Sequence, residues 1–283
     1  MRENKRLWIT VGLFIFGAFF VLGWFGREVY RNAPPIPERV QTASGETLVT
    51  REDILQGQQV WQSIGGQQVG SVWGHGAYQA PDWSADWLHR EAIALRDIVS
   101  LKRYGNPFGN LSAPEAAAVG EEVKAIMRKN TYDPTSGTLT VSEERAQAIA
   151  RTAEHYLALF GSDLDLGELR DAYALKESAV SDPLRRQALT AFFFWTSWAA
   201  TTQRPNTGAT YTNNWPHEPL VGNTPTSANL IWSLVSIALL IAGIGALVAY
   251  KLWLIMRFGL FMEIPARNLM SDEGGVGDFR SFG

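Results

Sequence analysis

The four histidines are the side chains best suited to metal binding or proton transfer. They are His75, His89, His155 and His217. No two of them lie four residues apart, the helical spacing that places two ligands on one face. His89 lies near Asp86 and Glu91, but such a group on a charge-rich helix is usually a solvated face. We therefore interpret the histidines as surface or hydrogen-bonded structural residues, and we predict no metal site.

Motifs for covalent and nucleotide chemistry are also missing. The sequence has no cysteine, which excludes disulfides, thiolate metal sites, iron–sulfur clusters and haem attachment through C-x-x-C-H. It has no G-x-S-x-G, no P-loop and no G-x-G-x-x-G that opens a helix. The pair Asp82 and Asp86 points to acid–base catalysis no more than any two acids do. We predict no catalytic, cofactor-binding or metal residue in this chain.

Aromatic side chains are unusually dense in one stretch. Within 27 residues the sequence places five large rings close to His75, namely Trp61, Trp73, Tyr78, Trp83 and Trp87. Rigid amphipathic rings of this kind often anchor contacts with another protein. The alternative is a Trp-rich core in a domain without disulfides, and the sequence leaves both interpretations open.

Two long apolar runs flank the part of the chain that holds most of the charges. The run from Leu7 to Gly26 has about twenty uncharged residues, enough for a helix to cross a hydrocarbon core of about 30 Å. No charge occurs from Pro219 to Tyr250, and the apolar core of that run starts at Asn229. A cleaved signal peptide is the alternative for the first run, and a buried helix of a soluble domain for the second. We predict two retained transmembrane helices.

Basic residues near the two runs predict their orientation. Arg2, Lys5 and Arg6 precede the first run, and Lys251 and Arg257 follow the second. Because cytoplasmic loops carry an excess of Lys and Arg, both termini should be cytoplasmic and the intervening segment extracytoplasmic. The net charge of −3 and the absence of a basic stripe argue against a nucleic-acid partner.

Capping signals predict that the outer segment is mainly helical. Thr50 to Asp53 and Ser112 to Glu115 are typical of helix starts, and Asp82 or Ser84 can cap a helix that stops at Gly105. Thr140 to Glu143 predicts a further helix that Gly161 terminates, and residues 132–139 predict a turn or hairpin before it.

One apolar stretch inside this segment is too short to span a membrane. Pro183 starts a helix that continues into AFFFWTSWAA (residues 191–200), about a dozen apolar residues. We predict a core helix, with a helix at the bilayer surface as the alternative. Residues 203–226, rich in Pro, Asn, Gly and Thr, should form a loop leading into the second span.

Two tracts resemble one protein family. The tract GQQVWQSIGGQQVGSVWGHGAYQAPDWSADWLHRE (residues 57–91) resembles the amino-terminal region of quinol-dependent nitric oxide reductases. The tract TTQRPNTGATYTNNWPHEPLVGNTPT (residues 201–226) is similar to the same family's connection into its second span. The resemblance covers most of residues 5–255.

The resemblance implies both a fold and a setting. Members of that family begin with one membrane helix, continue with an extracytoplasmic domain of cytochrome c-like fold without haem, and enter a second helix before a large catalytic bundle. That bundle belongs to the haem-copper oxidase superfamily and holds haem b, haem b3 and a non-haem iron. There NO is reduced to N2O with electrons from quinol, a step of the respiratory chain in denitrification. The implied fold class is a mainly α membrane protein in which two transmembrane helices flank a mostly helical, haem-free cytochrome c-like domain.

The family's catalytic residues have no counterpart in this sequence, because they lie in the bundle that would follow. We therefore expect a non-catalytic small subunit of a split reductase that covers a polytopic catalytic partner, with a fragment as the alternative. In that case haem b, haem b3, the non-haem iron and the contact with quinol belong to the partner. A stand-alone anchored binding or scaffold module would also fit the sequence, as would a subunit of a related enzyme with different NO or O2 chemistry.

The expected partner contacts and boundaries follow from this interpretation. We predict a docking surface formed by Trp73, His75, Tyr78, Trp83 and Trp87. On the second span, small residues leave a flat patch on which another helix can approach closely, namely Ala242, Gly243, Gly245 and Ala246. The predicted segments are 1–30 for the cytoplasmic start and first span, 31–227 for the outer domain, 228–256 for the second span and 257–283 for a cytoplasmic tail. We expect the bacterial inner membrane, with the central domain in the periplasm.

Overall fold

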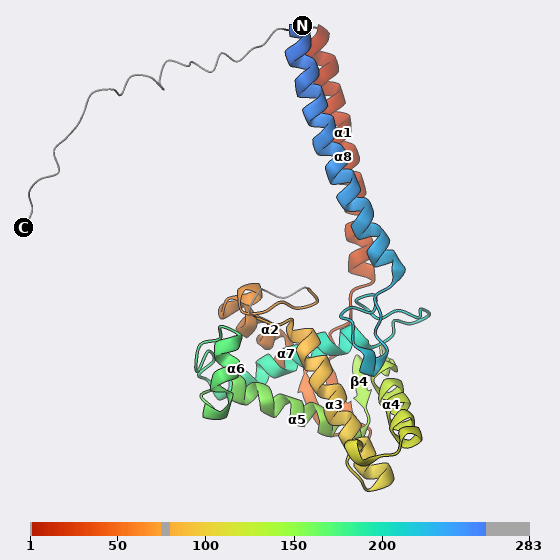
Figure 1. The fold of residues 1–283 in the computed structure, drawn as a ribbon, viewed down its shortest axis with the longest axis vertical. Helices are drawn as coiled ribbons and strands as arrows, with labels where there is room; N and C mark the ends of the chain where they lie inside the picture. Colours follow the sequence, from red (N-terminus) through yellow and green to blue (C-terminus); the bar gives the residue numbers. More distant parts are fainter. Residues whose placement is uncertain (1, 75–79, 259–283) are drawn as a thin grey trace, which may run out of the picture. The chain divides into compact units, whose positions relative to one another are not determined.

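The computed structural model describes residues 2–74 and 80–258, and the described part is mostly helical (Figure 1). The chain divides into two units, one of residues 1–226 and one that begins at Ser227. The first unit contains α1 and a domain of helices around a small sheet, and α8 forms the described part of the second.

Helices α1 (Arg2–Arg31) and α8 (Ser227–Phe258) contain the two predicted spans. Their apolar segments, Trp8–Arg31 and Leu230–Arg257, have mean hydropathies of 2.1 and 2.4, and the most apolar window of each is unburied within the chain. Both helices are therefore long and apolar enough to cross a membrane.

A four-stranded sheet stands at one side of the domain. Its strands are β1 (Arg39–Thr42), β2 (Thr47–Thr50), β3 (Tyr132–Asp133) and β4 (Thr138–Val141), in the order β2-β1-β4-β3. The hairpin of β3 and β4 confirms the prediction for residues 132–139. The sequence did not predict β1 and β2, which form an antiparallel pair, with β1 also paired in parallel to β4.

The predicted capping signals begin three of the helices. Thr50 forms a capping box with Asp53 at the start of α2 (Arg51–Ser63). Asp82 accepts the Ala85 N–H at 3.0 Å and starts α3 (Trp83–Tyr104). That helix ends at Gly105, whose φ of 66° lies in the left-handed region that glycine tolerates best. Helix α4 (Ala113–Arg128) follows Ser112 as predicted.

Helix α5 (Glu143–Leu159) starts later than the sequence predicts. Ser142, not Thr140, is its N-cap, because Thr140 is held in β4 by parallel pairing with Gln41. The helix also ends one residue earlier than predicted, with Phe160 as its C-cap before Gly161.

Helix α7 (Pro183–Thr201) is the centre of the domain and packs against α2, α3 and α5 (Figure 1). Every residue from Ala188 to Thr201 is buried, which confirms the prediction that residues 191–200 form a core helix. The closest approach is to α2, where a Cβ built on Gly57 would lie 2.0 Å from the Ala188 carbonyl oxygen. Only glycine at this position lets the two backbones come so near.

Two clusters of buried apolar side chains hold the domain together. The larger one joins α2, α3, α5, α7 and the sheet, and the smaller one joins α3, α4 and α5. The smaller cluster also contains Val221 from the loop before α8. Short helical segments complete the fold: η1 (Gly66–Gln68), η2 (Phe108–Asn110), η3 (Leu164–Leu166), α6 (Gly167–Ala172) and η4 (Pro219–Val221).

Candidate functional site

Side chains that bind metals do not gather anywhere in the described ranges. Across residues 2–74 and 80–258, no group of three or more His, Asp and Glu side chains is placed to hold a metal ion. The functional features of the domain are instead aromatic rings, buried ion pairs and a braced loop before α8.

Two of the predicted docking residues lie in the core. Trp83 and Trp87 are fully buried. The Trp83 ring stacks on Phe193 with centroids 5.3 Å apart, and the Trp87 ring stacks on Tyr156 at 5.0 Å. These two indoles therefore do not lie on the surface of the folded chain. They belong to the Trp-rich core that was the alternative interpretation.

Trp73 is placed differently, because it is only half-buried. Its φ is 53°, an uncommon value for a bulky residue, and its indole N–H donates to the Thr196 carbonyl of α7 at 2.8 Å. Its ring also packs on Trp195, with centroids 5.3 Å apart. Its neighbours in the prediction, His75 and Tyr78, lie outside the described residues.

The C-terminal half of α7 is hydrogen-bonded to the chain segment that follows α1 and to the segment that precedes α8. The Trp195 indole N–H donates to the carbonyl of Pro35, four residues after α1 ends, at 2.9 Å. The Asn223 side chain donates to the Ala200 carbonyl at 2.8 Å. We call residues 32–37, 71–74 and 202–226, which lie over this buried half of α7, the junction surface. Its first segment follows α1 in the sequence, and its last precedes α8.

Arg128, the last residue of α4, braces the loop of the junction surface. Its guanidinium donates to the side chains of Asn223 at 2.8 Å and Asn214 at 3.5 Å, and to three backbone carbonyls of residues 208–222. All these acceptors are neutral, and burial lowers the pKa of Arg128 from its ordinary value. Arginine nevertheless stays protonated at neutral pH, so the loop contains an uncompensated positive charge.

Arg204 adds a second positive charge to the same loop. Its guanidinium donates to the Asn213 side-chain oxygen at 2.6 Å. The backbone carbonyl of Asn213 accepts the N–H of Thr226, the residue immediately before α8, at 3.4 Å. Asn213 and Asn214 have φ values of 56° and 61°, in the left-handed region that asparagine tolerates. The loop is therefore a defined structure.

His89 ties this loop to α3. Its Nδ1 lies 2.8 Å from a carboxylate oxygen of Glu218. Glu218 is buried, while the His89 side chain is half exposed. The other Glu218 oxygen accepts the Leu220 N–H at 3.0 Å. Glu218 is therefore held by His89 and Leu220, and it forms no ion pair with Arg128 or Arg204.

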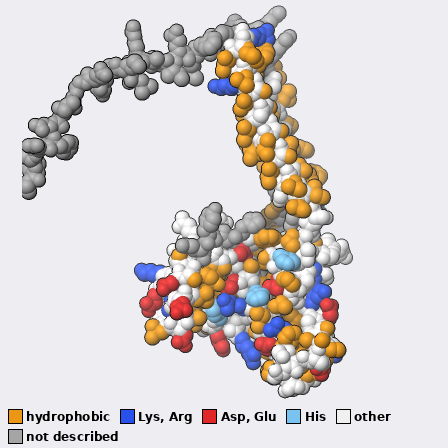
Figure 2. Space-filling model, in the orientation of Figure 1, with side chains coloured by type: hydrophobic (Ala, Val, Ile, Leu, Met, Phe, Trp, Pro, Cys, Tyr) orange, Lys and Arg blue, Asp and Glu red, His pale blue; other side chains and the backbone are white. Residues whose placement is uncertain are grey.

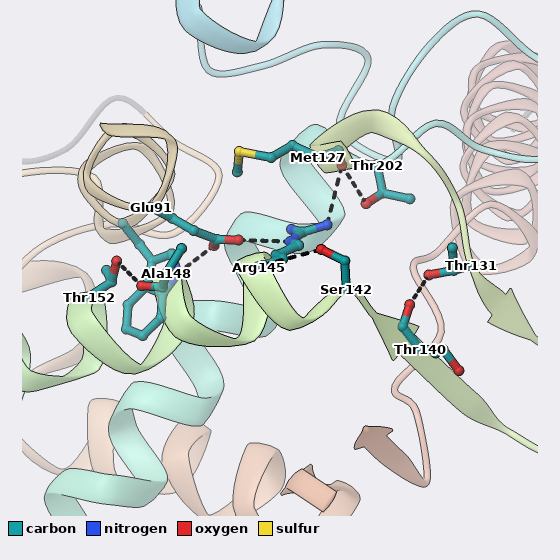
Figure 3. Close-up of polar contacts among 10 residues, drawn as sticks. Glu91, Met127, Thr131, Thr140, Ser142, Arg145, Ala148, Thr152 and Thr202 are labelled. Atoms are coloured by element: carbon teal, nitrogen blue, oxygen red, sulfur yellow. Dashed lines mark hydrogen bonds and ion pairs between the residues drawn. The ribbon is translucent and has the colours of Figure 1, made fainter. Parts of the chain in front are cut away.

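A buried ion pair links α3 to α5 (Figure 3). The Arg145 Nε donates to Glu91 at 2.8 Å, and both side chains are almost completely buried. The other Glu91 oxygen accepts the Trp87 indole N–H at 2.9 Å, and Arg145 also donates to the Met127 carbonyl at 3.4 Å. Both Glu91 oxygens and two of the three Arg145 nitrogens are hydrogen-bonded, while one Arg145 Nη has no partner among the described residues. The two buried charges compensate each other.

A second polar cluster lies one helical turn away on α3. The Tyr156 hydroxyl donates to Asp86 at 2.6 Å, and the Arg90 Nε donates to the same oxygen at 2.9 Å. Burial, followed by the negative charge of Asp86, raises the pKa of Tyr156 well above its ordinary value. Burial and the nearby charge of Arg90 lower the pKa of His155. The cluster keeps Tyr156 and His155 neutral and holds α3 against α5.

Gly243 and Gly245 lie within α8, on a helix whose side chains are exposed throughout the candidate span. A Cβ built on either glycine would meet nothing within 4 Å. Both positions are therefore open to a close approach by another helix, and the proposed role in docking stays a prediction.

Sequence reasoning missed the residues that build the junction surface. The sequence did not predict the contacts of Arg128, Trp195, Arg204 and Trp215. Arg204 and Trp215 lie in the tract of residues 201–226 that carries the family resemblance, but the tract does not specify what they bind. The signal that was present is the density of Asn, Gly and Pro in residues 203–226, which by itself predicts no more than a loop. Figure 2 shows that side chains of both charges lie on the domain, whereas mostly hydrophobic side chains lie along the two long helices.

Residues 37–217 match the model of one protein family, described as the cytochrome c-like domain of the nitric oxide reductase NorB. The matched range runs from the linker after α1, through the sheet and α2 to α7, into the loop of the junction surface. No curated protein matches the chain.

Proposed function

The chain belongs to the family of the NorB cytochrome c-like domain of nitric oxide reductases, and on this premise we propose that it is a non-catalytic, membrane-anchored part of a nitric oxide reductase. In this proposal a separate polytopic subunit holds haem b, haem b3 and a non-haem iron, and it reduces NO to N2O with electrons from quinol. The observation that carries the proposal is the family match over residues 37–217, flanked by two apolar helices.

Anchoring in the bacterial inner membrane is part of the proposal. It is supported by large hydrophobic side chains that are exposed on α1 and α8, such as Phe16, Phe19, Leu239 and Leu240. A helix that is hydrophobic all round needs an apolar environment, and the chain itself covers neither helix. The basic residues outside the two spans favour cytoplasmic termini and a periplasmic domain.

The cytochrome c-like domain does not fit a covalently held haem. The sequence offers no cysteine for thioether bonds. The volume between α3, α5 and α7 is filled by rings of the chain itself, including Trp83, Tyr156 and Phe193, each fully buried. His89 is engaged with Glu218. We therefore assign the domain a covering and docking role, and electrons reach the partner without passing through it.

Contacts with the catalytic subunit are proposed at two places. In the outer domain we propose half-buried Trp73 on the junction surface, which is the one of the three described docking residues that is not fully buried, and His75 and Tyr78 stay predictions. On α8, Gly243 and Gly245 give a helix of the partner room to pack closely. Together these contacts would hold the domain over the outer face of the catalytic subunit.

Purification of the chain from its native membrane in a mild detergent tests the proposal. We expect a large polytopic protein to co-purify and the visible spectrum to show b-type haem. A colourless, solitary protein would contradict the proposal and favour an independent anchored module. A haem-bearing partner that reduces O2 but leaves NO unchanged would retain the subunit role and overturn the assigned reaction.

A further inference from the structure

The loop of the junction surface carries positive charge at the point where the chain enters α8. We propose that Arg204 binds the phosphate headgroup of an anionic phospholipid. This inference rests on the membrane anchoring put forward under the proposed function. It adds a lipid-binding residue to the loop that leads into α8.

The first step is the short connection along the chain between the Arg204 loop and the apolar part of α8. Arg204 donates to Asn213, and Asn213 accepts the Thr226 N–H, so two hydrogen bonds connect the guanidinium to the residue before α8. Thr226 lies four residues before Leu230, where the candidate span begins. At 1.5 Å per residue this is about 6 Å along a helix. The headgroup layer on each side of a bilayer has a similar thickness, about 5–8 Å.

The second step is that the other apolar helix is tethered to the same surface. Pro35, which accepts from Trp195, lies only four residues after the end of α1. Two spans with a single outer domain leave the same side of the membrane. The segments that hold Pro35 and Thr226 must therefore both stay close to that membrane surface, and both belong to the junction surface.

The third step is the lack of a counter-charge. In the ranges 2–74 and 80–258, Arg204 forms no ion pair, and its buried Nε has no hydrogen-bond partner. Glu218 is the only carboxylate among residues 203–226, and it is engaged by His89 and Leu220. Arg128 is bonded to neutral oxygens and adds to the positive potential. A phosphate headgroup would supply the counter-charge that the described residues do not give Arg204.

The fourth step is the shape of the loop around Arg204. The Arg204 N–H donates to the Ala209 carbonyl at 2.9 Å, and the Thr207 N–H donates to the Arg204 carbonyl at 3.3 Å. This tight turn exposes Pro205 to Gly208 and leaves Arg204 half-buried at its base. Guanidinium groups recognise phosphate through paired, charge-assisted hydrogen bonds. Half-buried Trp73 and Trp215 border the same surface, as tryptophans do at membrane interfaces.

The test uses the full chain in nanodiscs of mixed phosphatidylcholine and phosphatidylglycerol, followed by native mass spectrometry of the lipids that stay bound. We expect Arg204→Gln to retain about fivefold less phosphatidylglycerol, the effect of one basic residue near an anionic surface. Arg204→Lys should retain an intermediate amount, because lysine preserves the charge but not the paired hydrogen bonds of a guanidinium. The matched control is Arg185→Gln, an exposed arginine at the opposite end of α7, 16 residues or about 24 Å from Thr201. It should behave as the wild type.

Each contrary outcome has a separate meaning. Equal lipid retention by Arg204→Gln and Arg185→Gln would overturn the inference. Loss of the bound lipid in excess inorganic phosphate would show a site for free anions and would also overturn it. If Arg204→Gln no longer co-purifies with the catalytic partner but retains the wild-type amount of lipid, the charge of Arg204 serves a protein contact and the inference is overturned. Extraction of the wild type from pure phosphatidylcholine membranes by alkaline carbonate would contradict the proposed anchoring itself.

Discussion

Glu91 and Arg145 place two opposite charges where water cannot screen them. Removing one partner leaves the other charge buried and unpaired, which typically costs about 3–5 kcal/mol. We expect Glu91→Gln and Arg145→Met each to lower the free energy of unfolding by about that amount. The measurement is denaturant unfolding of the full chain in detergent, followed by near-ultraviolet circular dichroism.

Lys102→Met is the control for this prediction. Lys102 pairs with Glu144 at the surface, where solvent screens the interaction, so its replacement should leave the unfolding midpoint unchanged. The double variant Glu91→Met with Arg145→Met should be less damaging than either single change, because no charge is left unpaired. An equal loss from the buried and the exposed replacements would contradict this account.

His155 gives the domain a defined response to acid. Its pKa is lowered from 6.5 in the fold by burial and by Arg90, while Asp86 acts in the opposite direction. The unfolded chain therefore binds the proton more readily, and stability falls as the pH drops below the ordinary histidine value. We expect the melting temperature to decrease between about pH 7 and pH 5, and His155→Gln to flatten this part of the profile. An unchanged profile in the variant would show that other groups cause the acid response.

Among the elements, sequence patterns predicted those whose signals are local. Thr50, Asp82 and Ser112 each cap a helix through residues no more than three positions away, so the pattern was sufficient. The sheet was missed because its central pairing is long-range: β1 joins β4, about a hundred residues later, and the local β1–β2 pair consists of two strands of only four residues each. Because Thr140 takes part in the β1–β4 pairing, α5 is capped by Ser142 and not by Thr140 as predicted.

The candidate site was harder to predict for the same reason. Arg128 and Arg204 donate hydrogen bonds to asparagine oxygens in a loop, and the sequence does not specify the shape of that loop. Trp83 and Trp87 have the composition of a contact surface, yet they point into the core. Aromatic density alone does not distinguish these two environments.

The contact between α2 and α7 depends on the missing side chain of Gly57. A Cβ there would lie 2.0 Å from the Ala188 carbonyl oxygen and 2.7 Å from the Phe192 Cβ. We expect Gly57→Ala to destabilise the domain by at least about 2 kcal/mol, although alanine favours helices by up to about 1 kcal/mol. Thermal unfolding of the full chain in detergent measures the effect.

Gly120 in α4 is the matched control, because a Cβ built there meets nothing within 4 Å. Gly120→Ala should stabilise the domain by about 0.5–1 kcal/mol through helix propensity alone. If both alanine variants shift stability in the same direction, close packing at Gly57 does not govern the α2–α7 contact.

On the scale of the whole molecule, the absence of cysteine makes it easy to test on which side of the membrane each segment lies. Thr135→Cys introduces a single thiol in the exposed turn between β3 and β4, and Ser271→Cys introduces one in the segment after α8. A membrane-impermeant maleimide should label the first variant in intact cells and the second only after lysis. Labelling of both in intact cells would contradict cytoplasmic termini.

Assembly with the partner tests the face of α8. Replacing Gly243 and Gly245 with leucine fills the space in which another helix can approach, so we expect co-purification of the catalytic subunit to be lost. Val248→Leu, which exchanges one bulky residue for another on the same helix, serves as the control. Unchanged co-purification of the double variant would remove α8 from the proposed interface.

The parallel pairing of β1 with β4 also sets the order of events during synthesis. The ribosome releases β1 early, but its partner strand β4 follows only about a hundred residues later. Helix α2 packs on α7, which ends at Thr201, so α2 cannot be covered until α7 has been synthesised. The half-made domain therefore exposes an unpaired strand edge and an uncovered apolar helix face for most of its translation. Such surfaces are prone to aggregation, so the nascent domain is most vulnerable before α7 has emerged.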